Sequence, residues 1–257
     1  MPQSYFNSKE PYGLVFAFHG LTGVCTEFGP SRGFIQYTDS LKFIFVYPCG
    51  YKGILGTAWN AGTCCLRGYN VDDNDLTKKM ITQMQANFRI NSTRIFATGF
   101  SNGGMISETL ACQNPGLFRA IASVGGANVM LPGNKEGMQN CDKAYAAGNG
   151  ANSAKTTTAV LLVHGDADPT VKWKGDALLG FPPTMDDFAA WAKRNKCSGN
   201  PVNTFKYAKF ENQLYKSCAY NTQVEVVRNL GGLHKWPADN TFNTTQYIMN
   251  FFHRFGL

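Results

Sequence analysis

The sequence predicts an α/β fold, with a mostly parallel central sheet and helices on both faces, formed by a single domain over residues 1–257. The first observation is that short, continuous apolar runs alternate along the chain with segments of helical spacing, as in sheets whose crossovers are helices. The second is that 257 residues, 44% of them hydrophobic and 16% charged, supply one large core. The sequence shows no internal repeat, and we expect no separate lid domain.

The candidate strands are apolar runs that end in Gly, Pro or polar residues. They span residues 14–18, 43–48, 95–98, 119–124, 159–163 and 224–227. Helical spacing is found in residues 71–88, 107–112, 185–192 and 243–255. Residues 128–158 are rich in Gly, Asn and Ala. We interpret them as a solvated surface loop over the carboxyl edge of the sheet, with a role in shaping a pocket as the alternative.

The net charge of +7 is moderate and is not gathered into a Lys- or Arg-rich run. This argues against a nucleic-acid-binding protein, whose basic residues cluster on one face. The charge favours approach to an acidic polymer, such as a polysaccharide that bears uronates, although solubility alone accounts for it. Because no apolar run is long enough to cross a bilayer, we expect no membrane association, and we expect a monomer.

The chain contains 8 cysteines, an even number, and is rich in Asn, Ser and Thr. Asn91 and Asn243 each begin an Asn-x-Ser/Thr glycosylation pattern. We therefore expect a secreted, extracellular enzyme whose signal peptide has been removed. A cytosolic enzyme with free thiols is the alternative.

The spacing of the cysteines gives expectations for two pairs. Cys197 and Cys218 bracket one polar, loop-like segment and should form a bridge. The neighbours Cys64 and Cys65 should each bond elsewhere, because a bridge between adjacent residues strains the peptide.

The candidate active site is organised around Gly99-Phe100-Ser101-Asn102-Gly103, a Gly-x-Ser-x-Gly pattern. An apolar run precedes it and a helix-like segment follows, which is the context of a nucleophile elbow. The two glycines let the strand and helix backbones pass closely and allow Ser101 a strained conformation. The helix N-terminus favours negative charge on an oxyanion. An ordinary turn is the alternative.

The loop after the first candidate strand, His19-Gly20-Leu21-Thr22-Gly23, is the candidate oxyanion loop. The backbone N–H of Leu21 or Thr22 should face the same point as the N–H of Asn102. We expect His19 to hold this loop by hydrogen bonds, with a direct role in the reaction as the alternative.

Asp168 and His234 are the candidate partners of the serine. An acid just beyond a strand and a histidine on a Gly-rich loop after the last strand complete the chain order Ser, Asp, His. Asp168 precedes Pro169, which stiffens its turn. Asp166 is the alternative acid, and we expect it to hold the loop through Asx-type hydrogen bonds. His253 lies in the last helical segment and should be a surface residue.

These residue types predict acyl transfer to water through an acyl-enzyme. Serine is a weak nucleophile at neutral pH and needs a base, and the base needs an orienting acid. His234 would take the proton of Ser101 and return it to the leaving group, and Asp168 would fix the tautomer of the imidazole. No metal or organic cofactor is needed, and we interpret the acids within residues 72–75 as helix capping rather than as a metal site.

Several motifs, in order along nearly the whole chain, carry a family resemblance. They are Val71-Asp72-Asp73, the stretch from Arg94 to Met105, Cys112, His164-Gly165 with Asp168, and His234-Lys235-Trp236-Pro237, with Trp59 and Cys64-Cys65 also in place. The chain resembles the feruloyl esterase and polyhydroxybutyrate-depolymerase-like esterases of carbohydrate esterase family 1. Two positions depart from the pattern of this group. Leu21 stands where many relatives have Cys, and Leu233 stands directly before the histidine, where relatives often have Gly.

The resemblance implies an α/β-hydrolase fold and plant cell-wall partners. The implied substrates are feruloylated arabinoxylan, with ferulate or related hydroxycinnamate esters, or acetylated xylan. The candidate functions are a feruloyl esterase, an acetylxylan esterase or polyhydroxyalkanoate depolymerase, and a non-catalytic carbohydrate-binding protein on a hydrolase scaffold. Trp59 and Trp236 lie on predicted loops beside the site, which favours a phenolic acyl group and makes them candidate substrate-binding residues. Core or rim packing of these rings is the alternative.

Overall fold

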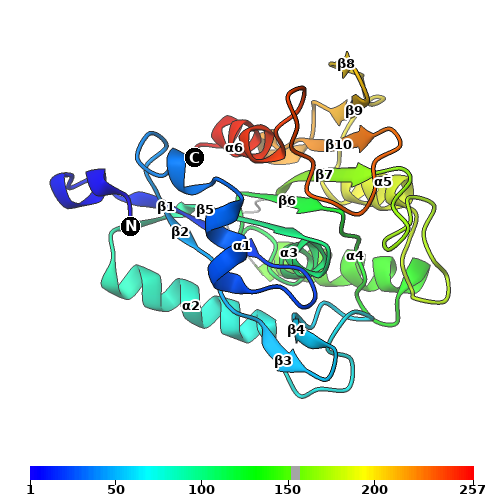
Figure 1. Ribbon diagram of the computed structural model, residues 1–257, viewed down its shortest axis with the longest axis horizontal. Helices are drawn as coiled ribbons and strands as arrows, with labels where there is room; N and C mark the ends of the chain where they lie inside the picture. Colours follow the sequence, from blue (N-terminus) through cyan, green and yellow to red (C-terminus); the bar gives the residue numbers. More distant parts are fainter. Residues whose placement is uncertain (152–156) are drawn as a thin grey trace.

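The computed structural model of the protein describes residues 1–151 and 157–257. Its centre is an eight-stranded sheet in the order β2-β1-β5-β6-β7-β10-β9-β8 (Figure 1). The strands of this sheet are β1 (Tyr12–Phe18), β2 (Phe43–Val46), β5 (Ile90–Phe100), β6 (Ala120–Val124), β7 (Ala159–Gly165), β8 (Lys206–Tyr207), β9 (Phe210–Tyr215) and β10 (Val224–Asn229). A separate hairpin is formed by β3 (Tyr51–Gly53) and β4 (Gly56–Ala58).

Six α-helices are described in residues 1–151 and 157–257. They are α1 (Cys25–Ser31), α2 (Asp73–Asn87), α3 (Asn102–Gln113), α4 (Asn134–Ala151), α5 (Thr184–Arg194) and α6 (Thr244–Arg254). Short 3₁₀ turns lie at Gln3–Asn7, Ile35–Tyr37 and Ala219–Asn221. In this described part of the chain, every helix falls short of the length and hydrophobicity needed to span a bilayer.

The sheet is parallel from β2 through to β10, and β9 and β8 extend it as antiparallel edge strands. The predicted mostly parallel sheet is therefore confirmed. The sequence does not predict β9, because its centre, Glu211-Asn212-Gln213, is polar. Tertiary contacts explain the strand: Phe210 and Leu214 are buried, and the amide of Asn212 donates to Glu225 Oε1 at 2.7 Å.

Alternate residues of the central strands point to opposite faces of the sheet. In β5, Ile95 and Ala97 belong to one hydrophobic cluster and Phe96 belongs to the other. Helices α2, α3, α4 and α5 supply side chains to the first cluster, and α6 supplies them to the second. Helices thus cover both faces, as the sequence predicts.

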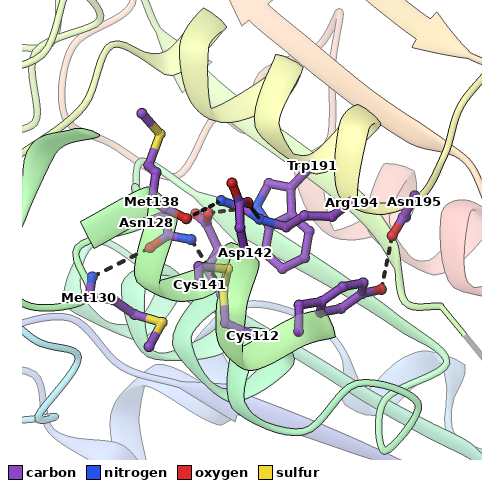
Figure 2. Close-up of polar contacts among 11 residues, drawn as sticks. Cys112, Asn128, Met130, Met138, Cys141, Asp142, Trp191, Arg194 and Asn195 are labelled. Carbon is purple, nitrogen blue, oxygen red and sulfur yellow. Dashed lines mark hydrogen bonds and ion pairs between the residues drawn. A yellow bond between two sulfur atoms is a disulfide. The ribbon is translucent and has the colours of Figure 1, made fainter. Parts of the chain in front are cut away.

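Residues 128–158 differ most from the sequence prediction of a surface loop. Residues Asn134–Ala151 form helix α4, and residues 152–156 of the predicted loop lie outside the described residues. Figure 2 shows two contacts that hold this helix against α3 and α5, namely the Cys112–Cys141 disulfide and the Asp142–Arg194 ion pair at 2.7 Å. In addition, the Tyr145 hydroxyl donates to Oδ1 of Asn195, directly after α5, at 2.9 Å. The helix is poor in large apolar residues, so its stability comes from partners distant in sequence rather than from a periodic apolar face.

All 8 cysteines are paired. The bridges are Cys25–Cys49, Cys64–Cys65, Cys112–Cys141 and Cys197–Cys218. The predicted Cys197–Cys218 bridge is confirmed. The prediction that Cys64 and Cys65 bond elsewhere is wrong, because the other cysteines pair among themselves and leave these neighbours only each other.

Candidate active site

Ser101 lies at the sharp turn between β5 and α3, with φ 56° and ψ −122°. Its neighbours hold this conformation, which non-glycine residues rarely adopt. The Ser101 N–H donates to Val124 O at 2.8 Å. A Cβ on Gly99 would lie 2.7 Å from Phe18 O, and one on Gly103 would lie 2.6 Å from His19 O. Both glycines are therefore required by the close approach of β1 to the turn, as a nucleophile elbow demands.

The structure brings Ser101, His234 and Asp168 together in one hydrogen-bonded line. The distance from His234 Nε2 to Ser101 Oγ is 2.9 Å, and that from His234 Nδ1 to Asp168 Oδ2 is 2.6 Å. With Nδ1–H donating to Asp168, Nε2 presents its lone pair to the serine hydroxyl. The Asp168 side chain is 1% exposed and that of His234 is 17% exposed, so the acid is buried while the base reaches the surface of the site.

Asp168 is held as a carboxylate by several donors. Its Oδ1 accepts the N–H groups of Thr170 at 2.8 Å and Val171 at 2.9 Å. Burial alone would raise the pKa of Asp168, but hydrogen bonds from His164, His234 and the Val171 backbone outweigh it and hold that pKa well below its usual range. These donors therefore favour the charged form of Asp168.

His164 is a neighbour of Asp168, and the sequence analysis did not predict this contact. Its Nε2 lies 3.5 Å from Asp168 Oδ2 and 2.6 Å from Val171 O, and the residue is 2% exposed. The signal in the sequence was its place at the end of the apolar run, four residues before Asp168, where β7 leads into the acid's loop. Phe100 is a second neighbour, because its ring centroid lies 4.8 Å from that of His234.

Asp166, the alternative acid, does not contact His234. Its Oδ2 accepts from Arg228 Nη2 at 2.8 Å, and its Oδ1 accepts the N–H of Gly231 at 2.6 Å. It therefore joins the loop after β7 to the loop that carries His234. This is a loop-holding role, as the sequence analysis expected, although the partners are distant in sequence rather than within one Asx turn.

The structure distinguishes between the two candidates in the oxyanion loop. The Thr22 N–H donates to Thr57 O in β4 at 2.8 Å and is therefore occupied. Among the described residues, the backbone N–H groups of Leu21 and Asn102 have no hydrogen-bond partner. Gly20 brings this loop against the nucleophile, since a Cβ on Gly20 would lie 3.3 Å from Ser101 Cβ. Leu21 and Asn102 are thus the candidate oxyanion donors.

His19 holds the oxyanion loop from within. The residue is 1% exposed, the Gly50 N–H donates to its Nε2 at 2.9 Å, and its Nδ1 lies 2.7 Å from Gly20 O. Burial lowers the pKa of His19 and outweighs the opposing effect of the bond to Gly20. A neutral imidazole that accepts at Nε2 and donates at Nδ1 fits both contacts.

Trp59 does not line a substrate cleft, and this part of the sequence prediction is wrong. Its side chain is 0% exposed, its Nε1 donates to His19 O at 2.9 Å, and its ring packs edge-on against Phe18 at 5.1 Å. A wholly buried indole packs in the core instead of contacting a ligand at the surface. Trp59 supports the oxyanion loop from within the core, through its bond to His19 O.

Trp236 is half-buried and packs against α1 and the segment that follows it. Its ring lies 5.9 Å from that of Phe28 and 6.0 Å from that of Phe34, and the Arg32 guanidinium lies 5.7 Å away. Its Nε1 donates to Thr245 Oγ1 at 3.2 Å, in α6. These contacts fit rim packing, which was the alternative for this ring.

A cavity of about 400 Å³, here called the loop cavity, lies between the segments that carry the site. Its described lining residues are Leu21, Ile54, Leu55, Thr63, Cys64, Cys65, Arg67, Tyr69, Thr170, Leu179 and Phe181. Leu21 belongs to the oxyanion loop, Thr170 bonds to Asp168, and Cys64 O accepts from Asn102 Nδ2 at 3.4 Å. The cavity therefore borders the oxyanion loop and the segments that bond to Asp168 and Asn102, and its walls are mostly apolar.

Each acid at the start of α2 has a local partner, although Asp73 Oδ1 has none among the described residues. Asp72 Oδ1 caps the helix by accepting the Asp75 N–H at 2.8 Å, and Asp75 pairs with Lys79 at 2.7 Å. Asp73 Oδ2 accepts the N–H of Asn60 at 2.6 Å. The capping interpretation therefore holds for Asp72, and Asp73 also fixes the loop that follows Trp59.

Known proteins similar to this chain include esterases. The family described as "Putative esterase" matches residues 1–238. Feruloyl esterase B of Piromyces equi is 25% identical over 233 residues, which cover 90% of this chain and 41% of that protein. Acetylxylan esterase A of Talaromyces purpureogenus is 27% identical over 115 residues, which cover 44% of this chain and 30% of that protein. The chain thus spans less than half the length of these curated relatives.

A solved structure shows the same fold. Acetyl xylan esterase from Aspergillus awamori superposes with a TM-score of 0.74 at 16% identity, covering 98% of this chain and 92% of that one. The predicted α/β-hydrolase fold is therefore confirmed. Because the family match extends over most of the chain, the protein belongs to this esterase family, which resembles carbohydrate esterase family 1.

Proposed function

We propose that this enzyme hydrolyses hydroxycinnamate esters, chiefly feruloyl esters, of plant cell-wall polysaccharide. The observation that carries the acyl assignment is the loop cavity, whose volume is about 400 Å³ and whose walls include Leu21, Leu55 and Phe181. Cavities above about 300 Å³ with apolar walls suit ring-sized ligands. An acetyl group leaves most of this volume empty, whereas a phenolic acyl group fills it and buries its ring.

The line from Ser101 to Asp168 supplies the chemistry. His234 Nε2 takes the hydroxyl proton while Ser101 Oγ bonds to the ester carbon, and the carbonyl electron pair moves to its oxygen. When the tetrahedral intermediate collapses, the C–O bond to the sugar breaks and the imidazolium protonates the departing alkoxide. Water then attacks the acyl-enzyme with the same base, which releases the free acid and restores Ser101.

The oxyanion is stabilised by backbone donors at two segments. Within residues 1–151 and 157–257, the N–H groups of Leu21 and Asn102 have no partner; Leu21 follows Gly20, which approaches Ser101, and Asn102 is the first residue of α3. The helix N-terminus adds a favourable field for negative charge. Donors fixed before the reaction need no reorganisation when the charge develops, and the loss of one such donor costs about a hundredfold or more in turnover.

Acetylxylan esterase is the second candidate. The similarity to acetylxylan esterase A favours it, since that match covers 44% of this chain. With an acetyl substrate, the loop cavity would hold part of the xylan chain rather than the acyl group. The two candidates share the mechanism and differ in which end of the ester enters the cavity.

Parallel rate measurements on methyl ferulate, acetylated xylan and nitrophenyl acetate test the assignment. We expect a higher kcat/KM for methyl ferulate than for acetylated xylan. We also expect Ser101→Ala to abolish nearly all turnover of every ester. Rapid acetate release without ferulate release would overturn the feruloyl assignment and leave the esterase mechanism in place. Near wild-type turnover by folded Ser101→Ala protein would overturn the proposed mechanism itself.

The proposal includes an extracellular setting and a polysaccharide partner. Pairing of all 8 cysteines supports secretion, because disulfides persist in oxidising compartments. The partner would be feruloylated arabinoxylan or a related cell-wall polymer, bound by a monomer.

A further inference from the structure

We propose that the Cys64–Cys65 disulfide is a specificity-determining wall of the acyl site, held in register with the oxyanion hole by the side chain of Asn102. This inference rests on the proposed ester hydrolysis at Ser101. It names the surface that selects a bulky acyl group over an acetyl group.

The disulfide forms part of the wall of the loop cavity. Cys64 and Cys65 both line it, together with Leu21 of the oxyanion loop and Thr170 of the segment after Asp168. Paired sulfurs have no S–H donor and form a compact, polarisable apolar surface. Such sulfur makes favourable contacts with aromatic rings. The bridge therefore suits a phenolic ring better than a pair of free thiols or serines would.

The position of the bridge in the sequence favours a role other than cross-linking. The remaining bridges join residues separated by 24, 29 and 21 positions, and each closes a loop of the chain. Cys64 and Cys65 have a separation of 1, so their bridge closes almost no loop. In the chain-entropy account, stabilisation by a disulfide grows with the loop that it closes. The adjacent pair therefore contributes little in this way.

Asn102 ties the disulfide segment to the nucleophile. The Trp59 N–H donates to Asn102 Oδ1 at 2.7 Å, and Asn102 Nδ2 donates to Trp59 O at 3.0 Å and to Cys64 O at 3.4 Å. Asn102 is 0% exposed, so these bonds are made away from water. Asn102 thus has two roles. Its backbone N–H is a candidate oxyanion donor, and its side chain holds the segment that forms the wall of the cavity.

The same segment is clamped from its other side. Asn60 N–H donates to Asp73 Oδ2 at 2.6 Å, and Asn60 Nδ2 donates to Val71 O at 2.9 Å. Within the segment, the N–H of Cys65 donates to Trp59 O at 3.1 Å. With anchors at both α2 and α3, the disulfide cannot retreat from a ligand without moving the elbow. The wall is therefore rigid, as shape selection requires.

The test is a Cys64→Ser/Cys65→Ser double variant assayed with methyl ferulate, nitrophenyl benzoate and nitrophenyl acetate. We expect KM to rise roughly fivefold for the two esters with an aromatic acyl group, methyl ferulate and nitrophenyl benzoate, because ring–sulfur contacts are lost. The KM for nitrophenyl acetate, whose acyl group is small, should change less than about twofold. The matched control is Cys197→Ser/Cys218→Ser, which removes a bridge outside the cavity lining. It should lower Tm without changing the ratio of aromatic to acetyl kcat/KM.

The outcomes separate this inference from the proposed function. If the wild-type enzyme does not hydrolyse methyl ferulate but hydrolyses nitrophenyl benzoate and nitrophenyl acetate, the feruloyl assignment fails. The ratio of kcat/KM for benzoate to that for acetate, compared between wild type and variant, then still tests the role of the disulfide. Equal change for aromatic and acetyl esters, or no change, overturns the inference. Should the double variant not fold, a crystal structure of wild-type enzyme inhibited at Ser101 by a phenyl-bearing phosphonate decides it. The ring must contact both sulfurs, and a ring placed elsewhere overturns the wall.

A second variant tests the role of Asn102 as a positioning residue. Asn102→Asp keeps the acceptor for the Trp59 N–H but sets a carboxylate oxygen against Trp59 O and Cys64 O. We expect kcat to fall for all the esters and KM to rise for the aromatic ones alone. A merely structural role would lower Tm and the amount of active enzyme without this split between kcat and KM. Unaltered aromatic KM in folded Asn102→Asp protein overturns the positioning role.

Discussion

The carboxylate of Asp166 accepts the backbone N–H of Gly231 at 2.6 Å and so joins the loop of the candidate acid to the loop of the candidate base. Arg228 neutralises the same carboxylate from β10 at 2.8 Å. Asp168, on the same loop as Asp166, bonds directly to His234 at 2.6 Å. One aspartate therefore positions a loop, while its neighbour orients the imidazole.

This division predicts unequal effects of the two Asp→Asn substitutions. Asp168→Asn should lower kcat for nitrophenyl acetate by about ten-thousandfold, because an amide favours the wrong tautomer of His234. Asp166→Asn should cost about tenfold or less, because it loosens a loop bond without touching the base. Both variants should be checked for native circular dichroism. The opposite ranking in folded proteins would show that Asp166 is the orienting acid.

Trp236→Ala should lower turnover of methyl ferulate and of nitrophenyl acetate by the same factor. The ring packs on Phe28, Phe34 and Arg32 and is not among the described residues that line the loop cavity. Trp236→Phe is the matched control and should retain more activity, since it keeps the aromatic contacts. A loss confined to methyl ferulate would instead place this ring against the phenolic acyl group.

Stability should fall with rising pH because of a buried acid pair behind the elbow. Glu108 in α3 is 0% exposed and Asp187 in α5 is 1% exposed; Trp191 Nε1 donates to Glu108 Oε2 at 3.1 Å. Burial raises the pKa of Glu108 well above its usual value, and the adjacent Asp187 carboxyl raises it further. In the folded state the pair therefore retains a proton that the unfolded chain releases.

The sign of the linkage follows from this raised pKa. The contribution is fully present below the unfolded pKa of Glu108, about 4.5, and is lost as the pH rises through the folded pKa. Tm measured from pH 5 to 9 should decline more in wild type than in Glu108→Gln, which cannot lose a proton. Parallel Tm profiles for the two proteins would exclude the acid pair as the cause.

Removal of the Cys112–Cys141 bridge should destabilise the fold without altering the site. The bridge joins α3 to α4 across 29 positions, and closing a loop of that size is worth about 3 kcal/mol. Cys112→Ala/Cys141→Ala should therefore lower the free energy of unfolding in guanidinium by about that amount. In contrast, kcat for nitrophenyl acetate at 25 °C should stay within about twofold. An unchanged unfolding midpoint would contradict the anchoring role assigned to the bridge.

The central sheet and the order of the candidate site could be predicted because both leave local signals. The strands before Ser101 and Asp168 are apolar runs, and the strand before His234 alternates between apolar and polar residues, so each of the three residues follows a recognisable strand. Parallel strands direct their carboxyl ends to the same edge, so the three loops had to converge there. The glycines flanking Ser101 were visible as well, since close backbone contact permits no Cβ.

Tertiary structure alone decided the features that depend on partners distant in sequence. Helix α4 lacks a strong apolar period and is held by Cys112, Arg194 and Asn195. The indole of Trp59 is buried and donates to His19 O, whereas its place on a predicted loop beside the site had made it a candidate substrate contact. The choice of Leu21 over Thr22 depended on Thr57, whose carbonyl occupies the Thr22 N–H.

The sequence by itself therefore determined the fold class and the esterase family, and it named the residues proposed to perform the chemistry. The tertiary structure decided which of those groups are free, which are occupied and what encloses the substrate. The physical reason is that periodicity and turn chemistry act over a few residues, whereas burial and hydrogen-bond pairing depend on which distant segments meet. Cys64 and Cys65 illustrate the difference. Their identity was plain in the sequence, and only the pairing of the other cysteines and the place of the loop beside Asn102 made them a wall of the site.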